Sequence, residues 1–135
     1  IASGGFDETV IVWNTGTGHI CDILGIDVES REGCITDVCF SPDGNRIASV
    51  HESGIVKIWP SSLVAKGKAL GDPGWSPETY AGDTTVPSVT IRAYTGSATF
   101  SPDGKRIVTG NGVQFSLDGK HMLVRSGGGG EVLGY

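Results

Sequence analysis

The sequence has no hydrophobic run of about 18 residues, and it has no charged start followed by an apolar stretch, as a signal peptide would. It therefore predicts neither a membrane span nor a membrane partner. The 10 Lys and Arg are outnumbered by 15 Asp and Glu, which gives a net charge of −5, and the basic residues are scattered along the chain. This distribution lacks the basic patch that a nucleic-acid surface needs, so no nucleic-acid partner is predicted.

Enzyme motifs are also missing. The sequence contains no G-x-S-x-G, H-E-x-x-H, G-x-x-x-x-G-K-[ST] or G-x-G-x-x-G pattern, so it predicts no catalytic residue and no cofactor. Its three cysteines, Cys21, Cys34 and Cys39, form no C-x-x-C pair, and the odd number favours buried thiols over a disulfide framework. We therefore expect a reducing compartment, the cytoplasm.

Candidate metal ligands are few and isolated. His19 and Cys21 would share one face of a strand, but no second pair has zinc spacing, so no metal site is predicted. Asp43, Asp103 and Asp118 each precede a glycine in a short turn, where Asp typically binds its own backbone. We expect these carboxylates to stabilise turns and not to bind calcium.

What the sequence does contain is β structure with frequent turns. Its 22 Gly and 6 Pro favour an all-β chain. Two apolar runs, Ile35–Phe40 and Arg46–Val50, flank the turn Ser41–Gly44, and a third run covers Ile55–Trp59. Val, Ile and Phe at this density suit strands, and Ser-Pro-Asp-Gly reverses the chain at low steric cost. The segment predicts a three-strand antiparallel unit.

An internal repeat links this unit to the start of the chain. Ile1–Trp13 matches Ile47–Trp59 at a constant offset of 46 residues. The pattern I-A-S-G-x-x-D-x-T-V-x-V-W, with V-x-F-S-P-D-G before the second copy, resembles the WD-repeat family of β-propellers. The resemblance implies an all-β fold, a partial WD-type β-propeller built of antiparallel blades, with roughly three blades' worth of chain.

The resemblance also implies a buried polar network. In that family it joins a Ser or Thr on the second strand, an Asp in the next turn, a Trp on the third strand and a Gly-His pair before the first strand. Five residues match these positions, namely Ser3, Asp7, Trp13, Ser49 and Trp59. The second copy has Ser53 in place of the Asp, and it has Ser30-Arg31 where the Gly-His pair should precede Ile35. We therefore expect an incomplete network and reduced stability.

The remaining sequence departs from the repeat. We expect four segments, which are 1–29 as the end of one blade, 30–59 as a complete three-strand unit, 60–87 as an irregular insert and 88–135 as degenerate repeats. Residues 88–96 resemble a third strand with Tyr94 in the Trp place, and 131–135 resemble another that ends in Tyr135. Residues 115–120 repeat 100–105 after only 15 residues, which indicates a duplicated hairpin or two joined repeats.

These observations favour a non-catalytic scaffold for protein–protein interaction, part of a larger regulatory or signalling protein. Trp75 and Tyr80 form a candidate partner-binding loop in the insert, or else cover an open blade edge. An incomplete ring predicts self-association through open blade edges. Two alternatives stay open. One is the propeller portion of a prolyl-oligopeptidase-type hydrolase, whose turns also read F-S-P-D-G, and the other is a decayed fragment without a function of its own.

Overall fold

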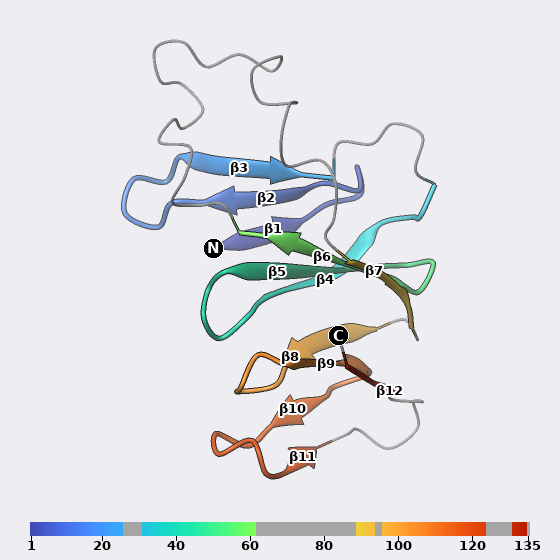
Figure 1. Ribbon diagram of the computed structural model, residues 1–135. Coiled ribbons are helices and arrows are strands. Elements are labelled where there is room, and N and C mark those ends of the chain that lie inside the picture. Colours follow the sequence, from blue (N-terminus) through green and yellow to red (C-terminus); the bar gives the residue numbers. More distant parts are fainter. Residues whose placement is uncertain (26–30, 62–88, 94–95, 124–130, 135) are drawn as a thin grey trace.

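The computed structural model describes residues 1–25, 31–61, 89–93, 96–123 and 131–134. All regular elements within these ranges are strands (Figure 1). They are β1 (Ala2–Gly4), β2 (Val10–Trp13), β3 (Ile20–Leu24), β4 (Ile35–Phe40), β5 (Arg46–His51), β6 (Ile55–Pro60), β7 (Val89–Arg92), β8 (Ser97–Phe100), β9 (Arg106–Gly110), β10 (Gln114–Phe115), β11 (Met122–Leu123) and β12 (Glu131–Gly134). Across the described ranges there is no helix that could cross a bilayer.

The strands form four antiparallel sheets that lie one after another along the molecule (Figure 1). Sheet 1 has the order β1-β2-β3, sheet 2 the order β4-β5-β6-β7 and sheet 3 the order β12-β9-β8. β10 and β11 pair only with each other and are called the hairpin below. The predicted all-β fold of antiparallel blades is confirmed.

Sheet 2 contains the three strands that the sequence predicts, and the turn after β4 has the expected geometry. Gly44 has φ of +71°, a conformation that glycine adopts without strain, and its N–H donates to Ser41 O at 2.9 Å. Ile47 then pairs with Phe40 on one side and with Trp59 on the other. The unit is not complete with three strands, however, because β7 pairs with β6 as a fourth.

This fourth strand corrects one prediction. Residues 88–96 were expected to supply the third strand of another blade, but Val89–Arg92 pair with Ile55–Ile58 of β6. The insert therefore separates the third and fourth strands of one blade, and β8 opens the next blade soon afterwards. Because β7 ends one blade and β8 begins the next, the few residues between Gly96 and Phe100 are enough, and no further strands are required between them. The predicted insert, 60–87, begins one residue too early, because Pro60 ends β6, and its residues 62–87 lie outside the described residues, as does Tyr94.

The C-terminal segments are placed as strands. β12 pairs with β9 and is the third strand of sheet 3, as the sequence indicates, whereas Tyr135 lies outside the described residues. The repeated F-S-x-D-G-K segment forms the hairpin, which follows β9 in the chain and precedes β12. The structure therefore shows a second hairpin of the same type, with two-residue strands.

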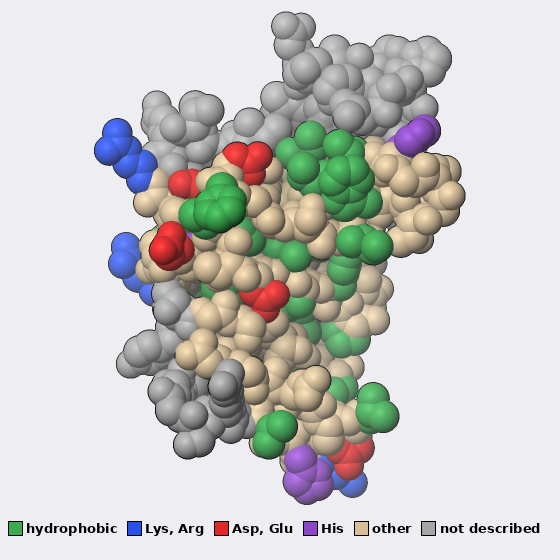
Figure 2. Space-filling model, turned by 180° about the vertical axis from the view of Figure 1, so that it is seen from behind, with side chains coloured by type: hydrophobic (Ala, Val, Ile, Leu, Met, Phe, Trp, Pro, Cys, Tyr) green, Lys and Arg blue, Asp and Glu red, His purple; other side chains and the backbone are tan. Residues whose placement is uncertain are grey.

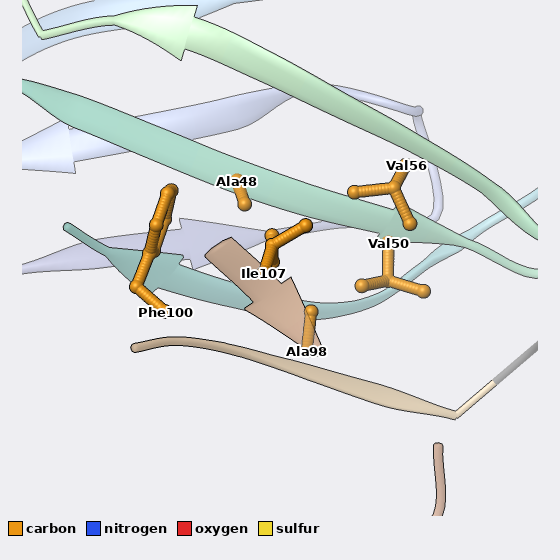
Figure 3. Packing of buried hydrophobic residues seen from close by; sticks show 6 residues of the cluster. All are labelled: Ala48, Val50, Val56, Ala98, Phe100 and Ile107. Atoms are coloured by element: carbon orange, nitrogen blue, oxygen red, sulfur yellow. The ribbon is translucent and has the colours of Figure 1, made fainter. Parts of the chain in front are cut away.

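The core consists of two apolar clusters, one on each face of sheet 2. Toward sheet 1, Ile47 and Trp59 pack with Val10, Val12 and Leu24. Toward sheet 3 the cluster joins three residues of sheet 2 to three of sheet 3, shown in Figure 3, which are Ala48, Val50, Val56, Ala98, Phe100 and Ile107. Sheet 2 is thus covered on both faces, which explains why apolar and polar residues do not alternate along β6.

The three cysteines are free thiols, each partly buried. Cys39 packs at the edge of the cluster between sheets 2 and 3, and its burial raises the pKa of the thiol to about 12. Such a group stays protonated and is a weak nucleophile at neutral pH.

Candidate functional site

The best-defined polar site is centred on the two repeated tryptophans. Trp59 Nε1 donates to Ser49 Oγ at 3.0 Å, and Trp13 Nε1 donates to Ser3 Oγ at 2.8 Å. Both bonds join the third strand of a blade to its second strand, across the same spacing of ten residues. The two copies of the repeat thus place the same side-chain pair in neighbouring sheets.

Asp7 does not join this pair in sheet 1. Its Oδ1 accepts from Thr9 N at 3.2 Å and from Thr9 Oγ1 at 2.9 Å, so it holds the turn between β1 and β2. The next residue, Glu8, has φ of +63° and accepts from Gly33 N at 3.2 Å. This turn is therefore fixed by its own carboxylate and by a bond to the segment before β4.

In sheet 2 the pair extends into a longer polar network. Ser49 Oγ lies 3.3 Å from His51 Nε2, and both residues are fully buried. Trp59 donates to the Ser49 oxygen, and the direction of the bond between the Ser49 hydroxyl and His51 Nε2 depends on the tautomer of the ring. His51 Nδ1 lies 3.9 Å from Glu32 Oε2, and the same oxygen forms an ion pair with Lys57 Nζ.

Sequence reasoning missed two members of this network, because it looked for them in the wrong elements. The resemblance led us to expect His before the first strand and the carboxylate in the turn after the second strand. Here the histidine, His51, ends the second strand β5, and the carboxylate, Glu32, lies before the first strand β4. Relative to the family pattern, the histidine lies near the place expected for the carboxylate, and the carboxylate lies near the place expected for the histidine. The Ser-x-His spacing on one strand face, from Ser49 to His51, is the signal that could have located the histidine.

The network is suited to stability and not to hydrolysis. Ser, His and a carboxylate also form the triad of many hydrolases. Here, however, Ser49 is 0% exposed and its oxygen already accepts a bond from Trp59. No substrate carbonyl can reach that oxygen in this structure. Lys57 Nζ lies 5.8 Å from the centre of the Trp59 ring, which adds a cation–π contact.

The charge state of His51 makes stability depend on pH. We expect the free energy of unfolding to fall between about pH 7.5 and about pH 5. Burial first, and then the Lys57 charge, hold the pKa of His51 below its ordinary value of 6.5, although Glu32 and Glu8 oppose them. Below about pH 6.5, His51 is protonated in the unfolded chain but not yet in the folded chain. The free energy of unfolding therefore falls as the pH is lowered, until the pH reaches the pKa of His51 in the folded chain.

Denaturant titrations at the two pH values measure this loss. His51→Gln is the control, because it removes the buried imidazole and leaves the exposed His19 and His121 in place. The variant should lose most of the dependence on pH. An unchanged dependence in the variant would show that His51 does not cause it.

The three Asp-Gly turns have the same hydrogen bonds, and the expected turn role is confirmed. In each, a Ser Oγ donates to the Asp Oδ1 at 2.5 Å, and the backbone N–H two residues after the Asp donates to it at 3.0 Å. These bonds, the serine bond first, hold the pKa of Asp43, Asp103 and Asp118 below the usual value.

The other candidates form no site in the described part of the chain. His19 is exposed, and within that part no group of three or more His, Cys, Asp or Glu side chains could hold a metal ion. Trp75 and Tyr80 lie outside the described residues, so the candidate partner-binding loop stays a prediction.

Comparison with known proteins agrees with the repeat. Residues 26–60 match the family described as WD domain, G-beta repeat. Protein HIR1 from Mycosarcoma maydis is 30% identical over 111 residues, which are 82% of this chain and 9% of that protein. Cilia- and flagella-associated protein 52 from Chlamydomonas reinhardtii is 39% identical over 59 residues, 44% of this chain and 9% of that protein. The chain spans less than a tenth of the length of these curated relatives.

The family match covers β4, β5 and β6, which carry Ser49, His51 and Trp59. It favours the WD reading over the hydrolase alternative. WD domains generally mediate protein–protein interaction and are typically non-enzymatic scaffolds. Residues 26–60 therefore carry a WD40 repeat, and the all-β arrangement of antiparallel sheets around them is consistent with a partial WD-type β-propeller.

Proposed function

We propose that this chain is a non-catalytic protein–protein interaction module of a larger regulatory or signalling protein. Its stacked sheets form a rigid scaffold, and the turns between strands contact the partner. The observation that carries the proposal is Phe6, which is 91% exposed at the turn between β1 and β2. A large aromatic side chain in water has no stabilising role there, whereas aromatic residues are enriched among the contacts that dominate protein interfaces.

The Phe6 turn is held in place before any partner binds. Asp7 accepts two bonds from Thr9 inside the turn, and Glu8 accepts from Gly33 outside it. Gly5 O accepts from Ile35 N at 3.1 Å, which ties the same turn to β4. A preorganised turn loses little conformational entropy on binding, so more of the contact energy appears as affinity.

Two further parts of this proposal come from the sequence. Trp75 and Tyr80 are proposed as a second partner contact in the insert. The cytoplasm is proposed as the compartment, on the basis of the odd number of cysteines, all three of them free thiols.

The test is a capture experiment followed by a measured affinity. The immobilised chain is used to isolate proteins from a cell extract, and each protein identified by mass spectrometry is purified and titrated against the chain by calorimetry. We expect Phe6→Ser to weaken a genuine partner by about tenfold or more. The matched control is Leu117→Ser, since Leu117 is also fully exposed but lies in the hairpin turn.

Two results would contradict the proposal. If no purified protein binds the chain more tightly than it binds an unrelated β protein, the interaction role is wrong. If a partner binds and Phe6→Ser leaves its affinity unchanged, the partner contacts another surface.

A further inference from the structure

Sheet 3 has a threonine at the position where the other two sheets have the serine of their Trp–Ser pair. Thr109 lies eight positions after the turn serine Ser101, just as Ser49 lies eight positions after Ser41. β9 is the second strand of its blade, as β5 is in sheet 2. Thr109 is therefore the equivalent of Ser49 and, through the 46-residue offset, of Ser3.

The Thr109 hydroxyl is buried without a hydrogen bond. Thr109 is 0% exposed, and no described residue forms a hydrogen bond with its Oγ1. The equivalent oxygens of Ser3 and Ser49 each accept from an indole N–H. A buried hydroxyl without a partner has lost its bonds to water and gained none in return, which destabilises the folded state. Sheet 3 thus keeps the acceptor of the pair and has no described donor for it.

Strand pairing identifies the position where the donor would belong. In sheet 2, Trp59 pairs with Ile47, two residues before the serine. In sheet 1, Trp13 exchanges two backbone hydrogen bonds with the first residue of the chain, which again lies two residues before the serine. The corresponding residue of sheet 3 is Ile107, and it pairs with Leu133 of β12. Residue 133 therefore has the register of the two tryptophans, and a leucine side chain has no donor.

The spacing of ten residues in the first two pairs does not reveal this position. Ten residues after Thr109 the sequence reaches Gly119 in the turn of the hairpin, because the hairpin lies between β9 and β12. Leu117 and Leu123 of the hairpin are exposed, and Figure 2 shows hydrophobic side chains at the surface of that end of the molecule. These leucines lie in water and have no donor to offer, so only the strand pairing locates the position.

We propose that sheet 3 is a blade without its Trp–Ser pair, because Leu133 occupies the tryptophan position and leaves the Thr109 hydroxyl buried without a donor. Thr109 shares a strand face with Ile107, two residues away, and Ile107 packs in the cluster between sheets 2 and 3 (Figure 3). This interface thus lacks a bond that the interface between sheets 1 and 2 has. The inference is independent of the proposed partner contact at Phe6.

The first test removes the hydroxyl. Thr109→Val keeps the β-branched shape, and we expect the denaturant midpoint of the full chain to stay unchanged or to rise. Ser49→Ala is the matched control, because it removes the hydroxyl at the equivalent position, where the oxygen accepts from Trp59. Its midpoint should fall. A midpoint of Thr109→Val clearly below that of the wild type would overturn the proposal, since the hydroxyl would then have a partner.

The second test supplies the donor. In the Leu133→Trp background, Thr109→Val should raise the equilibrium constant of unfolding about fivefold, as expected for the loss of one hydrogen bond, whereas in the wild type it should not raise it. The comparison cancels the cost of fitting the larger ring, because both chains in this background carry it. Tyr135→Trp is the control, since residue 135 lies two positions beyond the one that pairs with Ile107. Its background should leave the effect of Thr109→Val as in the wild type.

Circular dichroism checks that each variant retains the β fold. An equal effect of Thr109→Val in the wild type and in the Leu133→Trp background would overturn the assignment of residue 133. A coupling of Thr109 to Tyr135→Trp instead would overturn it as well. If Leu133→Trp does not fold, the comparison of Thr109→Val with Ser49→Ala decides alone, and a loss of stability in both would reject the proposal.

Discussion

Replacing Trp59 with Ala is expected to lower the free energy of unfolding by about 3–5 kcal/mol. The indole is 1% exposed and packs with Val10, Val12 and Leu24 of sheet 1, so its removal leaves a cavity between two sheets. The change also removes the donor to Ser49 Oγ. Denaturant titration of the variant against the wild type measures the loss.

Trp13→Ala is the matched control for this experiment. Trp13 makes the same hydrogen bond, to Ser3, but it is only partly buried, whereas Trp59 is 1% exposed. Its replacement should therefore cost clearly less than that of Trp59. Equal losses at the two positions, or a loss below about 1 kcal/mol at Trp59, would contradict the packing described here.

Glu32→Gln is expected to cost about 3 kcal/mol, which is the lower end of the range for breaking a buried ion pair. The Lys57 side chain is 9% exposed, and Glu32 is the carboxylate that pairs with it. Without that carboxylate, the ammonium group stays buried near His51, and the described part of the chain gives it no second ion pair. Thermal and denaturant unfolding of the variant measure the effect.

The reciprocal change should be cheaper. Lys57→Met keeps most of the side-chain volume and removes the buried charge. It leaves Glu32 Oε2, which is buried, without its partner, but the Glu32 side chain as a whole is 21% exposed and can turn toward water. We expect the loss in Lys57→Met to be smaller than the loss in Glu32→Gln. The opposite order would mean that the carboxylate, and not the ammonium group, is the costly member of the pair when left alone.

These two predictions concern one line of polar contacts that runs from the surface to the core of sheet 2. The line joins the segment before β4 to the end of β5 and then to β6, through Glu32, His51, Ser49 and Trp59. The Phe6 turn lies beside this line, because its Glu8 accepts a bond from Gly33, the residue after Glu32.

Local features of the sequence were sufficient for the strands and turns of sheet 2. β-branched runs bounded by Ser-Pro-Asp-Gly specify a hairpin through backbone sterics alone, and β4 and β5 lie where these runs predict. The offset of 46 residues also located the two Trp–Ser pairs, because equal spacing on paired strands brings the same side chains together. Residues 131–135 were expected to supply a third strand because they resemble one, and β12 pairs with β9 in that role.

Other features depend on which segments meet in space. The sequence pattern of β7 suits a third or a fourth strand equally well, and only its pairing with β6 decides between them. In the same way, nothing near His51 in the sequence identifies Glu32 as its neighbour.

By itself, the sequence determined the β-strands, their turns, the repeat and the Trp–Ser pairs, because these depend on backbone sterics and on spacing within one blade. Only the tertiary structure decided the role of β7, the exchange of histidine and carboxylate between elements, and the different burial of Trp13 and Trp59. The physical reason is that strand pairing and burial depend on the packing of whole sheets, so residues with the same local sequence can differ in burial.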